Sequence, residues 1–223
     1  MLTLDNVAKI VTKAMLKANK TYWNMSDKMT LHDHGIEQVA SYIIAQELRK
    51  AECRDGGTGW ATLETSFKSL KEWSGANRKR GRLNSALDKN GRVDVAFFDR
   101  NDALKGVVEV KRHLSYSNLA HDFARVRALL RAHGKRYDGT LRWGCVTGFH
   151  TEWAESIRTR KSFETRVDEI KSAIQVEFPD LVVRSSKKEE RLPVPEKFED
   201  DDGSPICLVG FAASSFLITL KRD

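Results

Sequence analysis

Two acidic residues and a lysine lie on two neighbouring segments that have the composition of β-strands. Asp94 lies in the apolar segment 92–99, and Glu109 and Lys111 lie in the next one, 105–112. Because successive side chains of a strand point to opposite faces, Glu109 and Lys111 share one face while Val108 and Val110 share the other. Each segment can therefore bury its valines on one side and present charged groups on the other.

A hairpin between the two segments would bring the carboxylates together. With a two-residue turn at Asn101 and Asp102, Asp94 lies directly opposite Glu109, and opposed Cβ atoms are about 4.5–5.5 Å apart. Like charges so placed repel each other unless a cation lies between them. Oxygen ligands suit Mg²⁺ or Mn²⁺, and the ammonium group of Lys111 beside them can orient a water or help to deprotonate it. The pattern predicts metal-assisted hydrolysis of a phosphodiester bond.

Helices and strands are expected to alternate around this pair. The order predicts an α/β fold in which a mixed β-sheet is flanked by helices. Alternation along 92–99 is expected to place Val93, Val95 and Phe97 on one face. We expect an amphipathic helical appendage at 1–30 and a single domain at 31–223. The expected helices are 4–19, 33–50, 118–133 and 151–178, the further strands are 60–67, 141–149, 181–185 and one or two within 206–220, and the expected loops are 68–90 and 187–204.

The charged residues also resemble the motif of a known family. Asp94, followed after 14 residues by Glu109-Val110-Lys111, is similar to the motif of the PD-(D/E)xK nuclease superfamily. The resemblance covers about 34–149 and implies a restriction-endonuclease-like core. It implies that Asp94 and Glu109 bind Mg²⁺ or Mn²⁺, that the carbonyl of Val110 is a further ligand, and that Lys111 assists the attacking water.

The same resemblance implies a further acidic residue on the first core helix. Glu37 is the best match because it lies near the start of that helix, and Glu47 is the alternative within its apolar stripe. The family's proline before the aspartate is absent, and Val93 stands in its place. The implied catalytic set is Asp94, Glu109, Lys111 and Glu37.

The basic residues favour a polyanionic partner. The chain has 38 Lys and Arg residues against 31 Asp and Glu residues, a net charge of +7. Phosphate contacts by such residues dominate affinity for nucleic acids. We expect a nucleic-acid partner, DNA in preference to RNA, and an endonuclease activity. The candidate contacts are Arg78, Lys79, Arg80 and Arg82 before the Asp94 strand, and Arg112 and Arg125 after Lys111.

Cysteine usage and hydropathy exclude several other classes of protein. The three cysteines form no C-x-x-C pair, so they indicate neither a disulfide framework nor a zinc site. A reducing compartment, the cytoplasm, is expected. The longest apolar stretch, 206–220, has 15 residues, whereas a membrane-spanning helix needs about 20. We therefore expect no membrane span.

Three other interpretations of these residues stay open. The acid pair and the lysine could form a solvated sheet face with a salt bridge. The chain could be a non-catalytic nucleic-acid-binding module that keeps the nuclease fold. It could also be an interaction protein that forms a homodimer through its N-terminal helix.

Overall fold

A mixed sheet forms the centre of the molecule, as expected. The computed structural model describes residues 2–29, 37–54, 56–76, 86–87, 91–154, 162–199 and 202–221. Its six-stranded sheet has the order β1-β2-β3-β4-β6-β5, with β3 and β4 parallel and the other neighbours antiparallel. The strands are β1 Trp60–Ser66, β2 Arg92–Phe98, β3 Leu104–Lys111, β4 Trp143–Trp153, β5 Leu181–Glu199 and β6 Pro205–Leu220.

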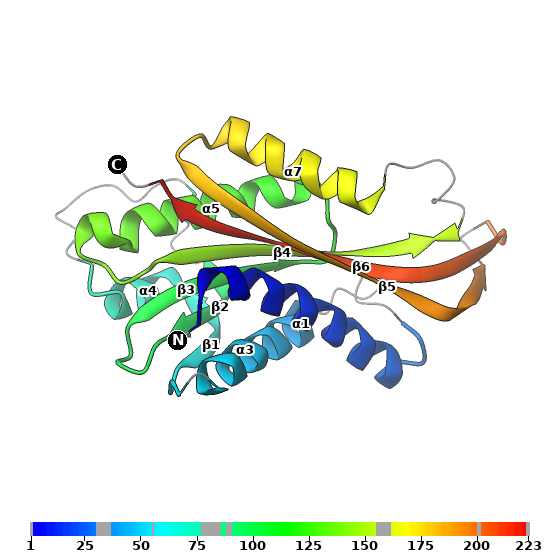
Figure 1. Ribbon diagram of the computed structural model, residues 1–223, viewed down its shortest axis with the longest axis horizontal. Coiled ribbons are helices and arrows are strands. Elements are labelled where there is room, and N and C mark those ends of the chain that lie inside the picture. The colour runs from blue at the N-terminus through cyan, green and yellow to red at the C-terminus, as the bar shows by residue number, and fades with distance from the viewer. Residues whose placement is uncertain are drawn as a thin grey trace.

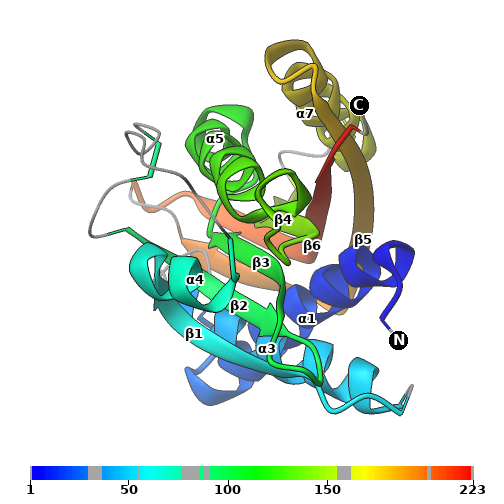
Figure 2. The same cartoon turned by 90° about the vertical axis from the view of Figure 1, so that its left-hand side faces the viewer.

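Helices cover both faces of the sheet. Helices α1 and α3 lie on one face, and α5 and α7 lie on the other (Figure 1). Viewed from the end, the sheet passes between these two helical layers, and α4 lies beside β1 (Figure 2). The described helices are α1 Leu4–Met25, α3 Glu37–Arg54, α4 Phe67–Trp73, α5 Tyr116–His133 and α7 Phe163–Glu177, with a 3-10 turn, η1, at Lys135–Tyr137.

Each face of the sheet has its own hydrophobic core. Val95, Phe97 and Val108 pack under α1 and α3, whereas Val93 and Ala96 pack in the core that includes α5 and α7. The prediction that Val93 shares a face with Val95 was therefore wrong. The regular pairing of β1 with β2 is interrupted between these two residues, next to Glu64, which has a φ of 50°.

The expected hairpin register is confirmed where the two strands pair. Val95 lies opposite Val108 and Phe97 lies opposite Gly106. The turn, however, is longer than two residues, and the register shifts by one residue after Phe97. The Asp99 side chain accepts hydrogen bonds from two backbone N–H groups of the turn, at 2.9 and 3.1 Å. These bonds satisfy the turn's donors without a tight two-residue turn.

Several element boundaries differ from those expected. Segment 187–204 is largely strand, because β5 continues to Glu199 and pairs with β6. Strand β4 continues to Trp153, so residues 151–153 are not helical, and α7 begins only at Phe163. The short helix α4 begins at Phe67, the last residue of the expected strand 60–67, and occupies the start of the expected loop 68–90. The expected boundary between 30 and 31 lies outside the described residues.

The N-terminal helix packs directly on the sheet. Val7, Val11 and Met15 of α1 are buried in the same core as α3 and the central strands. Among the described residues, no helix is long and apolar enough to cross a membrane.

Candidate active site

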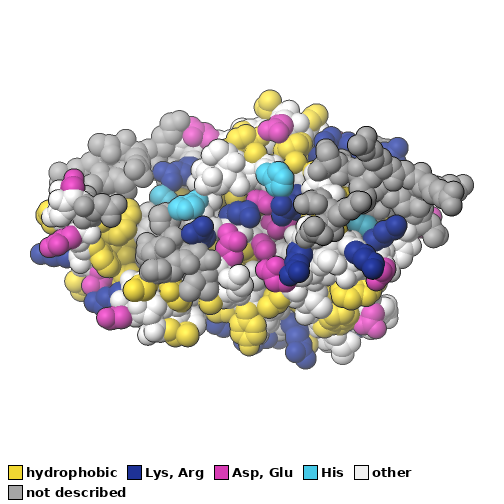
Figure 3. All heavy atoms as spheres, turned by 180° about the vertical axis from the view of Figure 1, so that it is seen from behind, with side chains coloured by type: hydrophobic (Ala, Val, Ile, Leu, Met, Phe, Trp, Pro, Cys, Tyr) yellow, Lys and Arg dark blue, Asp and Glu magenta, His cyan; other side chains and the backbone are white. Residues whose placement is uncertain are grey.

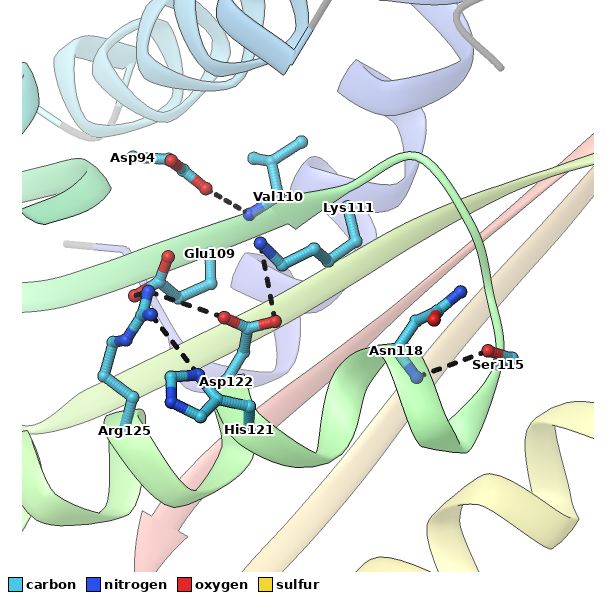
Figure 4. Close-up of polar contacts among 9 residues, drawn as sticks. All are labelled: Asp94, Glu109, Val110, Lys111, Ser115, Asn118, His121, Asp122 and Arg125. Atoms are coloured by element: carbon cyan, nitrogen blue, oxygen red, sulfur yellow. Dashed lines mark hydrogen bonds and ion pairs between the residues drawn. The ribbon is translucent and has the colours of Figure 1, made fainter. Parts of the chain in front are cut away.

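Asp94 meets β3 at the point where the regular strand pairing ends. The last paired residues are Val95 and Val108. Beyond them, the backbone N–H of Val110 donates a hydrogen bond of 2.6 Å to the Asp94 carboxylate (Figure 4). In a longer β2–β3 pairing, the Val110 N–H would donate to a backbone carbonyl of β2. Here it donates to the side chain of Asp94 instead. The register of the paired residues, extended by one position, would place Asp94 opposite Glu109.

Glu109 is buried on the α5 side of the sheet. It is 1% exposed, and its Oε1 accepts a hydrogen bond of 3.2 Å from Nη1 of Arg125. The same Nη1 lies 3.5 Å from Asp122, and Nη2 of Arg125 lies 3.3 Å from Nδ1 of His121. Figure 4 shows the guanidinium of Arg125 between the strand and its own helix.

Lys111 points toward the same helix. Its Nζ lies 3.6 Å from Oδ2 of Asp122, and the Asp122 side chain is only 3% exposed. Asp122 belongs to α5, which begins where the Ser115 side chain caps its N-terminus by accepting a hydrogen bond from the Asn118 N–H. Asp122 therefore holds Lys111 and Arg125 together, one on each carboxylate oxygen.

Burial raises the pKa of all three carboxyl groups. Desolvation is the main reason that the pKa of Asp94 is raised to about 6, although the Val110 N–H and Lys111 oppose it. Burial, followed by the charge of Asp94, raises the pKa of Glu109 well above its ordinary value. Burial also raises the pKa of Asp122, against the influence of Lys111 and Arg125. Ionising these three carboxyl groups is therefore unfavourable, because water stabilises their negative charge poorly.

Lys111 responds in the opposite way. Burial alone would lower its pKa, but the surrounding carboxylates outweigh burial and the pKa of Lys111 is raised. The carboxylates responsible are Asp122, Glu37, Asp94 and Glu109. Lys111 therefore stays an ammonium group at neutral pH and acts as a hydrogen-bond donor rather than as a base.

Glu37 lies close enough to influence this cluster. It is half-buried at the first described turn of α3, its charge raises the pKa of both Asp94 and Lys111, and it lines a small hollow with Lys111 and Arg112. Glu47, the alternative, instead forms ion pairs with Lys17 and Lys50, at 2.6 and 3.2 Å. The structure thus brings Glu37, and not Glu47, to the predicted site.

The candidate nucleic-acid contacts are only partly described. Arg112 is exposed at the end of β3, whereas Arg125 lies inside the cluster with Glu109. The basic residues Arg78, Lys79, Arg80 and Arg82 lie outside the described residues. Figure 3 shows acidic, basic and histidine side chains gathered at the centre of one face of the molecule.

The donor chemistry of the site fits a hard divalent cation. Asp94 and Glu109 supply carboxylate oxygens, and Val110 between Glu109 and Lys111 supplies a backbone carbonyl, the ligand types that Mg²⁺ and Mn²⁺ take. In the described part of the chain, no three His, Cys, Asp or Glu residues are already grouped as metal ligands. Because Glu109 already pairs with Arg125 at 3.2 Å, a cation at Glu109 would have to replace Arg125 as its partner.

Asp122 was missed by the sequence analysis, although a signal was present. It lies three residues after Leu119 and four before Val126, within the apolar stripe that buries α5. A buried acid in such a stripe needs a partner, and the two basic partners are Lys111 and Arg125.

No family model matches this chain, and no curated protein matches it either. The similarity to the nuclease motif therefore rests on the sequence spacing of Asp94, Glu109 and Lys111 alone.

Proposed function

We propose that this protein is a divalent-cation-dependent nuclease that hydrolyses phosphodiester bonds, DNA in preference to RNA. One observation carries the proposal: Asp94 and Glu109 meet where β2 and β3 stop pairing, both with raised pKa values, beside the ammonium group of Lys111. Burying two like charges together destabilises a fold. A cation that binds between them accounts for this arrangement.

Asp94, Glu109 and the carbonyl of Val110 would hold Mg²⁺ or Mn²⁺, with Glu37 completing the ligand set. Such a cation, when bound, polarises the phosphate and makes a nearby water more acidic. Lys111, kept protonated by its acidic neighbours, donates to a phosphate oxygen or orients the attacking water. Asp122 positions Lys111 through their 3.6 Å ion pair.

The alternative is a nucleic-acid-binding module without catalysis. It is favoured by the ion pairs that already join Glu109 to Arg125 and Asp122 to Lys111. In that case the acids neutralise internal cations, and only exposed basic residues such as Arg112 contact the phosphates.

A reducing cytoplasm is the compartment that we propose. Cys53, Cys145 and Cys207 are all free thiols, and Cys145 is fully buried between strands.

The decisive experiment is a cleavage assay on supercoiled plasmid, linear duplex, single-stranded and branched DNA, with RNA of matched sequence. We expect cleavage with Mg²⁺ or Mn²⁺, no cleavage with EDTA, and binding without turnover in Ca²⁺. Nicking of the closed circular plasmid would identify an endonuclease. Cleavage that survives EDTA would refute the metal-dependent mechanism. Binding without cleavage on every substrate would favour the alternative.

The variants Asp94→Asn and Glu109→Gln should abolish cleavage. Asp99→Asn is the matched control, because Asp99 lies at the other end of β2 and pairs with Lys105 at 2.9 Å. Its cleavage rate should equal that of the unmodified protein.

A further inference from the structure

Arg125 is shared between two buried carboxylates that come from different elements. Its Nη1 lies 3.2 Å from Glu109 on β3 and 3.5 Å from Asp122 on α5. The two carboxylate side chains are 1% and 3% exposed, whereas the Arg125 side chain is 22% exposed. Of the three side chains, that of Arg125 is therefore the one with room to move toward solvent.

Charge balance links this position to cation binding. The four side chains joined by ion pairs are Glu109, Asp122, Lys111 and Arg125, so the group carries two negative and two positive charges when both acids are ionised. A divalent cation at Glu109 would add two positive charges beside the guanidinium. Repulsion over a few ångströms in a poorly solvated site is large, so Arg125 and the cation compete for Glu109.

We propose that Arg125 is a displaceable internal cation that occupies Glu109 in the metal-free protein and passes to Asp122 when a divalent cation binds. This inference rests on the proposed function, because it requires a cation site at Glu109. It makes Arg125 a regulatory residue of that site, because a stronger contact between Arg125 and Glu109 lowers the affinity for the cation.

The surroundings of Arg125 explain why it moves and Lys111 stays. Arg125 contacts Glu109 directly, whereas the ion pair of Lys111 is with Asp122. After leaving Glu109, Arg125 keeps the nearby Asp122, and its guanidinium already lies 6.0 Å from the ring centroid of Phe67. An aromatic face stabilises a guanidinium, so the displaced position remains favourable.

Cation binding without catalysis tests the proposal. Mn²⁺ alone is titrated into the full chain and bound ion is measured by electron paramagnetic resonance, at pH 8 and low salt. Arg125→Ala should bind Mn²⁺ about tenfold or more tightly than the unmodified protein, since a competing positive charge is gone. Arg127→Ala is the matched control: Arg127 lies on the same helix with similar exposure but pairs with Asp180 at 2.8 Å.

A second substitution, Asp122→Asn, distinguishes the transfer of Arg125 to Asp122 from a simple effect of the Asp122 charge on the cation. Asp122→Asn removes the alternative partner of Arg125, so it should weaken Mn²⁺ binding strongly in the unmodified background. In the Arg125→Ala background the same substitution should have a much smaller effect. Equal effects in both backgrounds would mean that Asp122 acts only through its charge, and would overturn the transfer of Arg125.

A measurement on the unmodified protein keeps the proposal testable if Arg125→Ala fails to fold. The guanidinium NMR signals of ¹⁵N-labelled protein are followed during titration with Mg²⁺, and Arg125 is assigned by Arg125→Lys. The Arg125 signal should shift in step with Mg²⁺ binding while that of Arg127 stays fixed. Mg²⁺ binding with no change in the Arg125 signal, or equal Mn²⁺ affinities of the Arg125→Ala and Arg127→Ala variants, would overturn the inference and leave the nuclease proposal standing. No Mn²⁺ binding by any variant would overturn both.

Discussion

Replacing Asp94 by Asn should stabilise the metal-free protein, although it should abolish cleavage. The pKa of Asp94 is raised from 3.8 to about 6, and since each unit corresponds to about 1.4 kcal/mol, the ionised carboxylate destabilises the fold by about 3 kcal/mol. Asn keeps an oxygen that can accept the hydrogen bond from the Val110 N–H. Because Asp94 also raises the pKa of Glu109, the substitution relieves the neighbouring carboxylate as well. We expect a gain of about 1–3 kcal/mol above pH 7.

The pH dependence of this gain has a definite sign. A carboxyl group whose pKa is higher in the folded state than in the unfolded state destabilises the fold when it is ionised. Below about pH 4, Asp94 is protonated in both states, so Asp94→Asn should change little. The gain should grow between about pH 4 and 6, where the native pKa of Asp94 lies, and stay constant above.

Divalent cations should make the unmodified protein more stable than Asp94→Asn, which is the reverse of the order expected without metal. A ligand that binds only the folded state at one hundred times its dissociation constant adds about 2.7 kcal/mol. Mg²⁺ should therefore raise the melting temperature of the unmodified protein by several degrees and that of Asp94→Asn much less.

Thermal melts from pH 4 to 8, with EDTA or with Mg²⁺, measure both effects. Asp99→Asn is the control: burial raises the pKa of Asp99, but Lys105 and the turn N–H groups outweigh it and the net pKa is lowered. That substitution should destabilise the protein above pH 4 and leave the response to Mg²⁺ unchanged. If Asp94→Asn lowers metal-free stability at pH 7.5, or if Mg²⁺ stabilises it as much as the unmodified protein, Asp94 is a structural residue and the reasoning fails.

Three further predictions test the rest of the site. Lys111→Ala should lose cleavage while keeping most of the Mg²⁺ stabilisation in melts, because an ammonium group is not a metal ligand; loss of both would make Lys111 structural. Arg78→Ala with Arg80→Ala should weaken DNA binding equally across sequences and reduce the slope of log K against log salt by about 0.9 for each lost phosphate contact; an unchanged slope would place DNA elsewhere. Gly144→Ala should destabilise the protein by about 1–3 kcal/mol in denaturant titrations, because its Cβ would lie 2.1 Å from Val126 of α5; an unchanged midpoint would contradict the close packing of α5 on β4.

Local pattern was sufficient to find strands β2 and β3 and the register between them. The alternation of apolar and charged residues around Asp94 and Glu109 fixes which residues can face each other, and Val95 does lie opposite Val108 as expected. Pattern failed for β5, whose outer half begins with the charged run 187–191 and contains two prolines, Pro193 and Pro195. Backbone hydrogen bonds to β6 hold that strand in place. Backbone hydrogen bonds do not depend on side-chain type, so the residue pattern does not reveal them.

The sequence by itself determined that Glu109 and Lys111 lie on one face of their strand, because strand periodicity is a local property. Only the tertiary structure decided what surrounds them. Helix α5 packs so closely on β4 that Asp122 and Arg125 reach Lys111 and Glu109, and these contacts join residues more than ten positions apart. Whether an acid is paired, buried or able to take up a cation depends on such distant neighbours, since desolvation and charge act through space and not along the chain.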